Sequence, residues 1–376
     1  MAQHFLSHTH NTLFHYQPIC NHSKITIPSS LYIFIHIFVF KKCINCAACS
    51  NFAASNFKRT INNSAHVVYQ QPSTPQELTD SRAAMAACPV AAIRVETNAH
   101  RHHGLEHFTN LEQELARSMA LSPTLNGYNL PFPRPLTNNV WYLGHHNEKS
   151  FGAIPYLLHT SDNQWIMVDT PRFGTSAVQA VTSLTGPTGP NYLFLTHVDD
   201  TADHGKWVDK FPSLQRIFHS GDLGTNNWLG DDTLEHVEIL LHTTKSSNTR
   251  NNERQAFHID GTIFTKEEAA ASSHELVVYH TPGHSPGSIV LYHQPSGVLF
   301  SGDTLGYSNR LNTLTGFPQY GNNRLQQAET LQWIKELDWT IVAPGHGHVK
   351  NYGKNHQASR NQELDDAIQE LSTTRE

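Results

Sequence analysis

Negative charge is missing from the beginning of this chain. No Asp or Glu precedes Glu77, although the whole sequence of 376 residues carries 32 acidic residues and a formal net charge of -6. Long apolar runs are missing as well, because none reaches the roughly 18 residues that a helix needs to cross a bilayer. We therefore expect a protein that is soluble when mature and has no membrane partner. The acidic balance leaves no broad basic surface for phosphate groups, which disfavours nucleic acid as the main partner.

Cysteine is absent after the first quarter of the chain, where Cys20, Cys43, Cys46, Cys49 and Cys88 all lie. A secreted protein built on disulfides usually distributes its cysteines more widely. A local Cys-x-x-Cys-x-x-Cys run is instead typical of a metal or cluster site in a reducing compartment. Histidine, with 27 copies, is abundant and also fits metal binding.

Residues 1–42 combine Ser, Thr, Asn and His with one apolar stretch, Leu31 to Phe40, and resemble an organelle transit segment. Arginine is absent until Arg59, which is unusual for such a segment. A secretory signal and a wrongly assigned gene start are the alternatives, and the secretory interpretation lacks a basic n-region and a small-residue cleavage site. We expect a plastid (chloroplast) location first and a mitochondrial one second.

The rest of the chain is long enough for a small domain followed by a large one. We predict a cysteine-marked domain over residues 43–96, a linker over 97–135, a large domain over 136–352 and a C-terminal helix within 353–376. Periodicity predicts strands over 140–143, 154–159, 165–168, 192–195, 276–279, 288–292, 298–300 and 340–342. It predicts helices over 175–184, 204–211, 323–337 and 361–372. Polar stretches at 243–255 and 266–273 are predicted as surface insertions.

The cysteine triplet Cys43, Cys46 and Cys49 is followed much later by Cys88 and a proline. Three closely spaced thiolates can bind three corners of a cubic cluster, and a predicted strand over 65–69 and helix over 75–87 would return the chain to supply the fourth. The pattern resembles a single-cluster bacterial-type ferredoxin, which implies a small α+β domain whose four cysteines hold a 4Fe-4S cluster for electron transfer or for structure. The alternative, zinc held by four thiolates, usually shows two Cys-x-x-Cys pairs.

Five fragments of the large domain place His or Asp at the ends of predicted strands. They supply Asp169, the loop from His197 to His204, His284, Asp303 and His346. One such residue alone is more often an ordinary surface group or a helix cap, but the ordered set indicates a metal centre. The set resembles the five motifs of the metallo-β-lactamase superfamily, which implies an α/β (α+β) fold, a four-layer αββα sandwich.

That resemblance also implies roles for these side chains. Asp203, His204 and His346 would surround one divalent ion, zinc or iron, and His197 and His284 a second one. Asp303 would bridge the two ions, Asp169 would support the metal-binding loop by hydrogen bonds, and Asp203 and His204 would be catalytic.

The second fragment departs from the family's His-x-His-x-Asp-His pattern. Asp199 takes the place of the second His, as in the superfamily's di-iron flavoproteins, and the Asp203-His204 pair comes two residues late. A carboxylate at Asp199 favours iron or manganese over zinc. Alternatively, neither Asp199 nor Asp200 binds and only one metal ion is held.

Three functions remain open at this point. The resemblance implies a hydrolase of a small molecule with an ester, thioester, lactone or amide bond. The fused cysteine domain and Asp199 favour a redox enzyme, in which the 4Fe-4S cluster feeds an iron centre and an electron donor or acceptor protein is a partner. The irregular second fragment favours a non-catalytic protein that senses redox state or binds partners.

Overall fold

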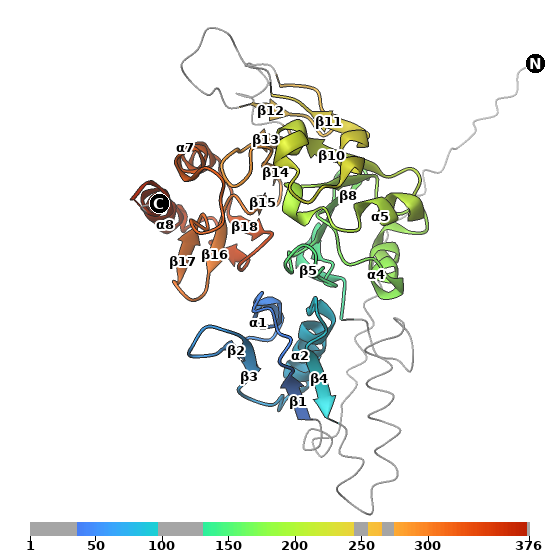
Figure 1. Cartoon of the computed structure of the whole chain (residues 1–376), viewed down its shortest axis with the longest axis vertical. Coiled ribbons are helices and arrows are strands. Elements are labelled where there is room, and N and C mark those ends of the chain that lie inside the picture. The colour runs from blue at the N-terminus through green and yellow to red at the C-terminus, as the bar shows by residue number, and fades with distance from the viewer. Residues whose placement is uncertain (1–35, 97–130, 244–254, 265–273, 374–376) are drawn as a thin grey trace, which may run out of the picture.

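The computed structural model describes residues 36–96, 131–243, 255–264 and 274–373 (Figure 1). Most of the predicted transit segment, most of the linker, most of the first predicted insertion and all of the second lie outside these residues. The organelle location therefore stays a prediction. Within the described part of the chain, no helix has the length and apolarity needed to cross a bilayer.

The small domain is built from two short antiparallel pairs and two helices. The pairs are β1 (His36–Val39) with β4 (Ile93–Glu96), and β2 (Phe57–Arg59) with β3 (His66–Val68). The helices are α1 (Ala48–Phe52) and α2 (Pro75–Ala87). Helix α2 begins where Thr74 accepts a hydrogen bond from the Glu77 amide at 3.1 Å, and it ends at Cys88 because Pro89 cannot continue it. Strand β1 lies within the predicted transit segment, so this fold begins before Cys43.

The large domain contains two sheets. One sheet has the order β11-β10-β9-β8-β7-β6-β5 and the other the order β12-β13-β14-β15-β18-β19. The first consists of β5 (Arg134–Thr137), β6 (Val140–Tyr142), β7 (Tyr156–His159), β8 (Trp165–Val168), β9 (Tyr192–Phe194), β10 (Gln215–His219) and β11 (Ile239–Leu241). The second consists of β12 (Ala256–Phe257), β13 (Leu276–His280), β14 (Ile289–His293), β15 (Val298–Gly302), β18 (Ile341–Pro344) and β19 (Lys350–Asn351). A separate hairpin pairs β16 (Gly306–Ser308) with β17 (Thr313–Thr315).

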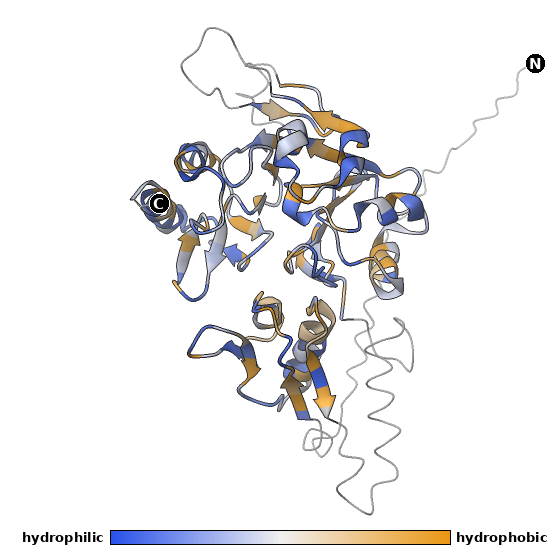
Figure 2. Ribbon diagram, in the orientation of Figure 1, coloured by the Kyte–Doolittle hydropathy of each residue, from blue (hydrophilic) through white to orange (hydrophobic). Residues whose placement is uncertain are grey.

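The two sheets pack face to face, and a helical layer covers each outer face. Apolar side chains such as Phe194 and Phe300 meet between the sheets, whose strands are orange in Figure 2 where they are most apolar. Helices α4 (Thr175–Thr185) and α5 (His204–Lys210) cover the first sheet, and α7 (Arg324–Lys335) and α8 (Gln357–Thr373) cover the second. The predicted αββα sandwich is confirmed. All predicted strands and helices occur, with ends shifted by at most a few residues. The sequence analysis missed the short helix α1 and the strands β1, β2, β4, β5, β10, β11, β12, β16, β17 and β19. Of these, β10 starts with the polar residues Gln215 and Arg216, which conceal its apolar pattern.

The small domain packs directly against the large one. The Phe52 ring, at the end of α1, lies 5.0 Å from the Phe132 ring and 5.4 Å from the Tyr142 ring. The Arg172 guanidinium donates to the Pro89 carbonyl at 2.7 Å. The cysteine-bearing segments therefore lie at the domain interface.

Candidate metal centre

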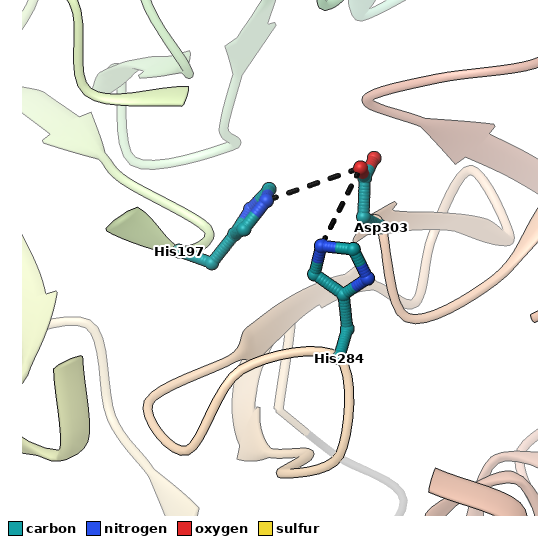
Figure 3. Close-up of side chains that lie close together, drawn as sticks. All are labelled: His197, His284 and Asp303. Atoms are coloured by element: carbon teal, nitrogen blue, oxygen red, sulfur yellow. Dashed lines mark ion pairs between the residues drawn. The ribbon is translucent and has the colours of Figure 1, made fainter. Parts of the chain in front are cut away.

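Loops from both sheets bring the predicted ligands together at one edge of the sandwich. His197 follows β9, His284 lies in the turn between β13 and β14, and Asp303 follows β15 (Figure 3). One Asp303 oxygen, Oδ2, lies 3.9 Å from His197 Nε2 and 3.7 Å from His284 Nε2. Asp199 joins this group, because its Oδ2 lies 3.6 Å from His197 Nε2 and 3.7 Å from His284 Nε2. Two imidazoles and two carboxylates thus face one point.

A second group shares Asp303 with the first. Asp200, Asp303 and His346 offer ligand atoms that all lie within 4.8 Å of one another. His346 Nδ1 lies 2.8 Å from one Asp303 oxygen and 2.9 Å from the other. Glycine at position 345 makes this approach possible, since a Cβ there would lie 2.8 Å from an Asp200 oxygen and 3.0 Å from an Asp303 oxygen.

The donor atoms of both groups fit metal ions. Among the described residues, the two Asp200 oxygens, His197 Nε2 and His346 Nε2 are buried without a hydrogen-bond partner. Buried polar atoms are normally paired, and buried carboxylates need a proton or a cation. Imidazole nitrogens and carboxylate oxygens suit zinc, iron and manganese, and a shared carboxylate suits a pair of ions.

The pKa shifts in the group of Asp200, Asp303 and His346 also indicate that positive charge is favoured there. Burial raises the pKa of Asp200 well above its ordinary value. Burial acts against protonation of His346, yet the adjacent Asp303 carboxylate raises the pKa of this imidazole to about 9. A cation between these residues would take the place of the protons that they otherwise hold.

Asp169 supports His197 through one intervening residue. Its carboxylate accepts the Thr196 amide at 2.9 Å and the Thr196 hydroxyl at 3.0 Å. That hydroxyl lies 3.0 Å from His197 Nδ1. Because the hydroxyl proton is used on Asp169, the hydroxyl oxygen accepts from His197 Nδ1–H, which leaves the Nε2 lone pair facing the centre.

Asp222 is a supporting residue that the sequence reasoning missed. Its carboxylate accepts from the Val198 amide at 3.0 Å, the Ser285 hydroxyl at 2.7 Å and the Gly287 amide at 2.5 Å. It thereby joins the loop of His197 to the loop of His284. A Ser-Gly-Asp run after a buried strand was the available signal, but β10 had not been recognised as a strand.

The structure does not bring Asp203 and His204 into either group. Asp203 has left-handed backbone, with φ at 64°, and its carboxylate accepts from Asn147 at 2.8 Å and from Lys206 at 2.6 Å. The two ring nitrogens of His204 lie 3.0 Å from Asp231 and 3.1 Å from Arg216. Asp200 occupies the place in the second group that the sequence pattern assigned to this pair.

The four cysteines of the small domain line one cavity, together with His66 and Pro89. Cys43, Cys46, Cys49 and Cys88 are free thiols. Burial raises the pKa of Cys46 to about 12, and the nearby thiols of Cys88 and Cys43 contribute to this rise. Backbone amides donate to two of the sulfur atoms, from Ala92 to Cys88 at 3.1 Å and from Asn45 to Cys43 at 3.4 Å. Four clustered thiols, two of them with amide donors, fit an iron-sulfur cluster, whose iron ions replace the thiol protons.

Comparison with known families identifies both domains. Residues 155–346, half of the chain, match the model of the metallo-beta-lactamase superfamily. The chain belongs to the metallo-β-lactamase superfamily. Residues 40–95 match the model described as the 4Fe-4S single cluster domain of Ferredoxin I. This member of the superfamily therefore carries a ferredoxin-type domain ahead of its metallo-β-lactamase domain.

Curated relatives match only part of this superfamily member. "Probable metallo-hydrolase YqjP" of Bacillus subtilis is 36% identical over 74 residues, which are 19% of this chain and 23% of the relative. The "Hydroxyacylglutathione hydrolase" of Bartonella tribocorum is 28% identical over 129 residues, 31% of this chain and 46% of the relative. The chain thus spans less than half the length of either relative.

Two solved metallo-β-lactamases are similar to part of this chain. The DIM-1 enzyme shows 16% identity and a TM-score of 0.40, covering 62% of this chain and 96% of its own. The mono-zinc form of FIM-1 from Pseudomonas aeruginosa shows 14% identity and a TM-score of 0.42, covering 64% and 96%.

Proposed function

We propose that this protein is a metal-dependent hydrolase of a small molecule with an ester, thioester, lactone or amide bond. The observation that carries the proposal is the position of Asp303, which is shared by a group with His197, Asp199 and His284 and a group with Asp200 and His346. Metal ions held there would polarise the scissile carbonyl and lower the pKa of bound water towards about 7. Thioesters are the first substrates to test, because two matched relatives are named hydroxyacylglutathione hydrolases.

Some residues would hold the ligands of the centre in position, and others would line the route by which a substrate enters. Asp169 and Thr196 fix the tautomer of His197, and Asp222 fixes the separation of the loops that carry His197 and His284. The Asp199 and His346 side chains are each 21% exposed, so the centre opens to solvent beside them. The exposed Trp228 ring donates to Asp199 at 2.6 Å and would flank an entering substrate.

The test is hydrolysis by anaerobically purified full-length protein of defined metal content. We expect turnover of at least one ester or thioester in a broad panel, and its loss in the variants Asp303→Ala and His284→Ala. A Lys354→Ala variant, altered in the loop before α8, is the matched surface control. Stoichiometric metal without turnover of any ester, thioester, lactone, amide or phosphodiester would contradict the proposal.

A second candidate is a redox enzyme in which iron in the centre gains one electron from the reduced 4Fe-4S cluster, itself reduced by a donor protein. Direct contact between the two domains favours it, because Cys46 lies against Gly152 of the large domain. Elemental analysis tests the redox candidate. Zinc in the large domain of the active protein would remove the redox candidate, since zinc has no accessible second oxidation state.

A further inference from the structure

Helix α1 connects the cysteine site to the His346 loop. Cys46 lies just before the helix, Cys49 lies within it, and Asn51 in its last turn donates from Nδ2 to the Gly347 carbonyl at 3.0 Å. Gly347 follows His346 directly, so the small domain holds the backbone on one side of this predicted ligand. The helix has only five residues and no side-chain N-cap, so its own hydrogen bonds cannot fix its position.

A second contact reaches the other side of His346. A Cβ on Gly152 would lie 2.8 Å from Cys46 Cβ, so this segment of the large domain packs directly on the cysteine loop. In the same segment, the Ile154 amide donates to the Gly345 carbonyl at 2.8 Å. Gly345 in turn touches the carboxylates of Asp200 and Asp303.

His146 contacts both helix α1 and the segment that contains Gly152. Its Nδ1 lies 2.8 Å from the Gly152 carbonyl, and because a carbonyl only accepts, Nδ1 carries the proton. The Phe52 ring of α1 packs edge-on against this buried imidazole at 5.9 Å. Both neighbours of His346 are therefore held by contacts that begin at the segment from Cys46 to Phe52.

We propose that the small domain positions a ligand of the metal centre. Asn51 is a positioning residue for His346, and occupancy of the cysteine site by its cluster strengthens metal binding in the large domain. The proposal rests on the metal site proposed above. Coupling of this kind between two sites typically changes affinity by about 5–150-fold, and it is reciprocal. The small domain would thus make the metal content of the centre depend on the supply of iron-sulfur cluster.

The experiment measures Co²⁺ affinity by chelator competition in the full-length protein. It also records the visible Co²⁺ difference spectrum against the same protein without Co²⁺, so that the cluster absorption cancels. The variant Asn51→Asp replaces the amide donor with a carboxylate of the same shape, and Asn51→Ala removes it, in case the first variant does not fold. The control Tyr69→Phe removes another side-chain bond to a backbone carbonyl of the small domain, 3.1 Å from Tyr69 Oη to Ala54, away from the interface. The cluster absorption of each protein verifies that the cysteine site is filled.

We expect Co²⁺ to bind at least about 5-fold more weakly to both Asn51 variants, with an altered spectrum, and within about 2-fold of wild type to Tyr69→Phe. Removal of the cluster from wild type should weaken Co²⁺ binding at the large-domain centre similarly, and should have less effect in Asn51→Asp. Co²⁺ taken up by the freed cysteine thiolates is recognised by its thiolate charge-transfer absorption and is counted separately. Equal affinities with and without the cluster, or an equal effect of cluster removal in wild type and Asn51→Asp, would overturn the proposal. If the two sites are coupled but no substrate is hydrolysed, only the proposed hydrolase function is refuted. If a substrate is hydrolysed but the two sites are not coupled, only this inference is refuted.

Discussion

Asp200 and Asp303 bring carboxylate oxygens within 4.8 Å of each other and of a nitrogen of His346. Both side chains are buried, and neither Asp200 oxygen has a hydrogen-bond partner among the described residues. Two carboxylates at this separation, away from water, repel strongly unless a proton or a cation lies between them. The pair is therefore the part of the centre whose behaviour depends most on the metal.

The first prediction concerns the metal-free protein and the variant Asp200→Asn. Burial raises the pKa of Asp200, so the folded state binds this proton more tightly than the unfolded state. The contribution of this proton to the free energy of unfolding is complete below about pH 4. It is lost as pH rises towards the folded-state pKa of Asp200, by about 1.4 kcal/mol for each pH unit between the unfolded and folded pKa values. Urea unfolding from about pH 5 to pH 8 should show the metal-free wild type losing stability relative to Asp200→Asn. Parallel pH profiles would contradict this.

The second prediction concerns metal preference. Asp199 faces His197 and His284 where the family pattern has a third imidazole, and replacing it by histidine softens the ligand set. The variant Asp199→His should favour zinc over manganese by about tenfold more than wild type, as measured by competitive metal binding. As a control, Trp228→Phe removes the hydrogen bond to Asp199 but keeps the carboxylate, so its preference should stay that of wild type. Unchanged selectivity in Asp199→His would mean that Asp199 is not a ligand.

The third prediction tests which histidines bind metal, those that face the centre in the fold or those that the sequence pattern assigns. His284→Ala should lose bound metal, whereas His204→Ala should keep the metal content of wild type. His204 is buried against Arg216 and Asp231, so its removal should cost about 1–3 kcal/mol of unfolding free energy instead. Elemental analysis and urea unfolding of both variants make the comparison. Metal loss in His204→Ala would restore the ligand role that the sequence pattern assigns to it.

The fourth prediction concerns the cysteine site. Cys88→Ala should lower the iron and acid-labile sulfide content and the visible absorption of the anaerobically purified protein, because one corner of the cluster would lack its thiolate. Cys20→Ala should change none of these, since this cysteine is outside the predicted ligand set. Wild type with one zinc ion per chain in the small domain, and no visible absorption, would instead support the four-thiolate zinc site.

Much of the architecture could be predicted from the sequence because it depends on local patterns. Thr74, Pro75 and Pro89 delimit helix α2, and apolar strands that end in His or Asp place ligands at one sheet edge. The order of Asp169, His197, His284, Asp303 and His346 along the chain was enough to indicate a metal centre and its family.

Only the tertiary structure decided which residues of the loop from His197 to His204 face the centre. Resemblance to the family pattern assigned Asp203 and His204 to one metal ion. The left-handed backbone at Asp203 and the hydrogen bonds to Asn147 and Lys206 direct its carboxylate elsewhere, and Arg216 holds the His204 ring. Asp200 faces the centre instead. The contact of Asn51 with Gly347 could not be predicted from the sequence either, because the two residues lie in different domains. Local propensity determines where a strand ends, whereas the direction of a loop side chain depends on partners that are distant in sequence.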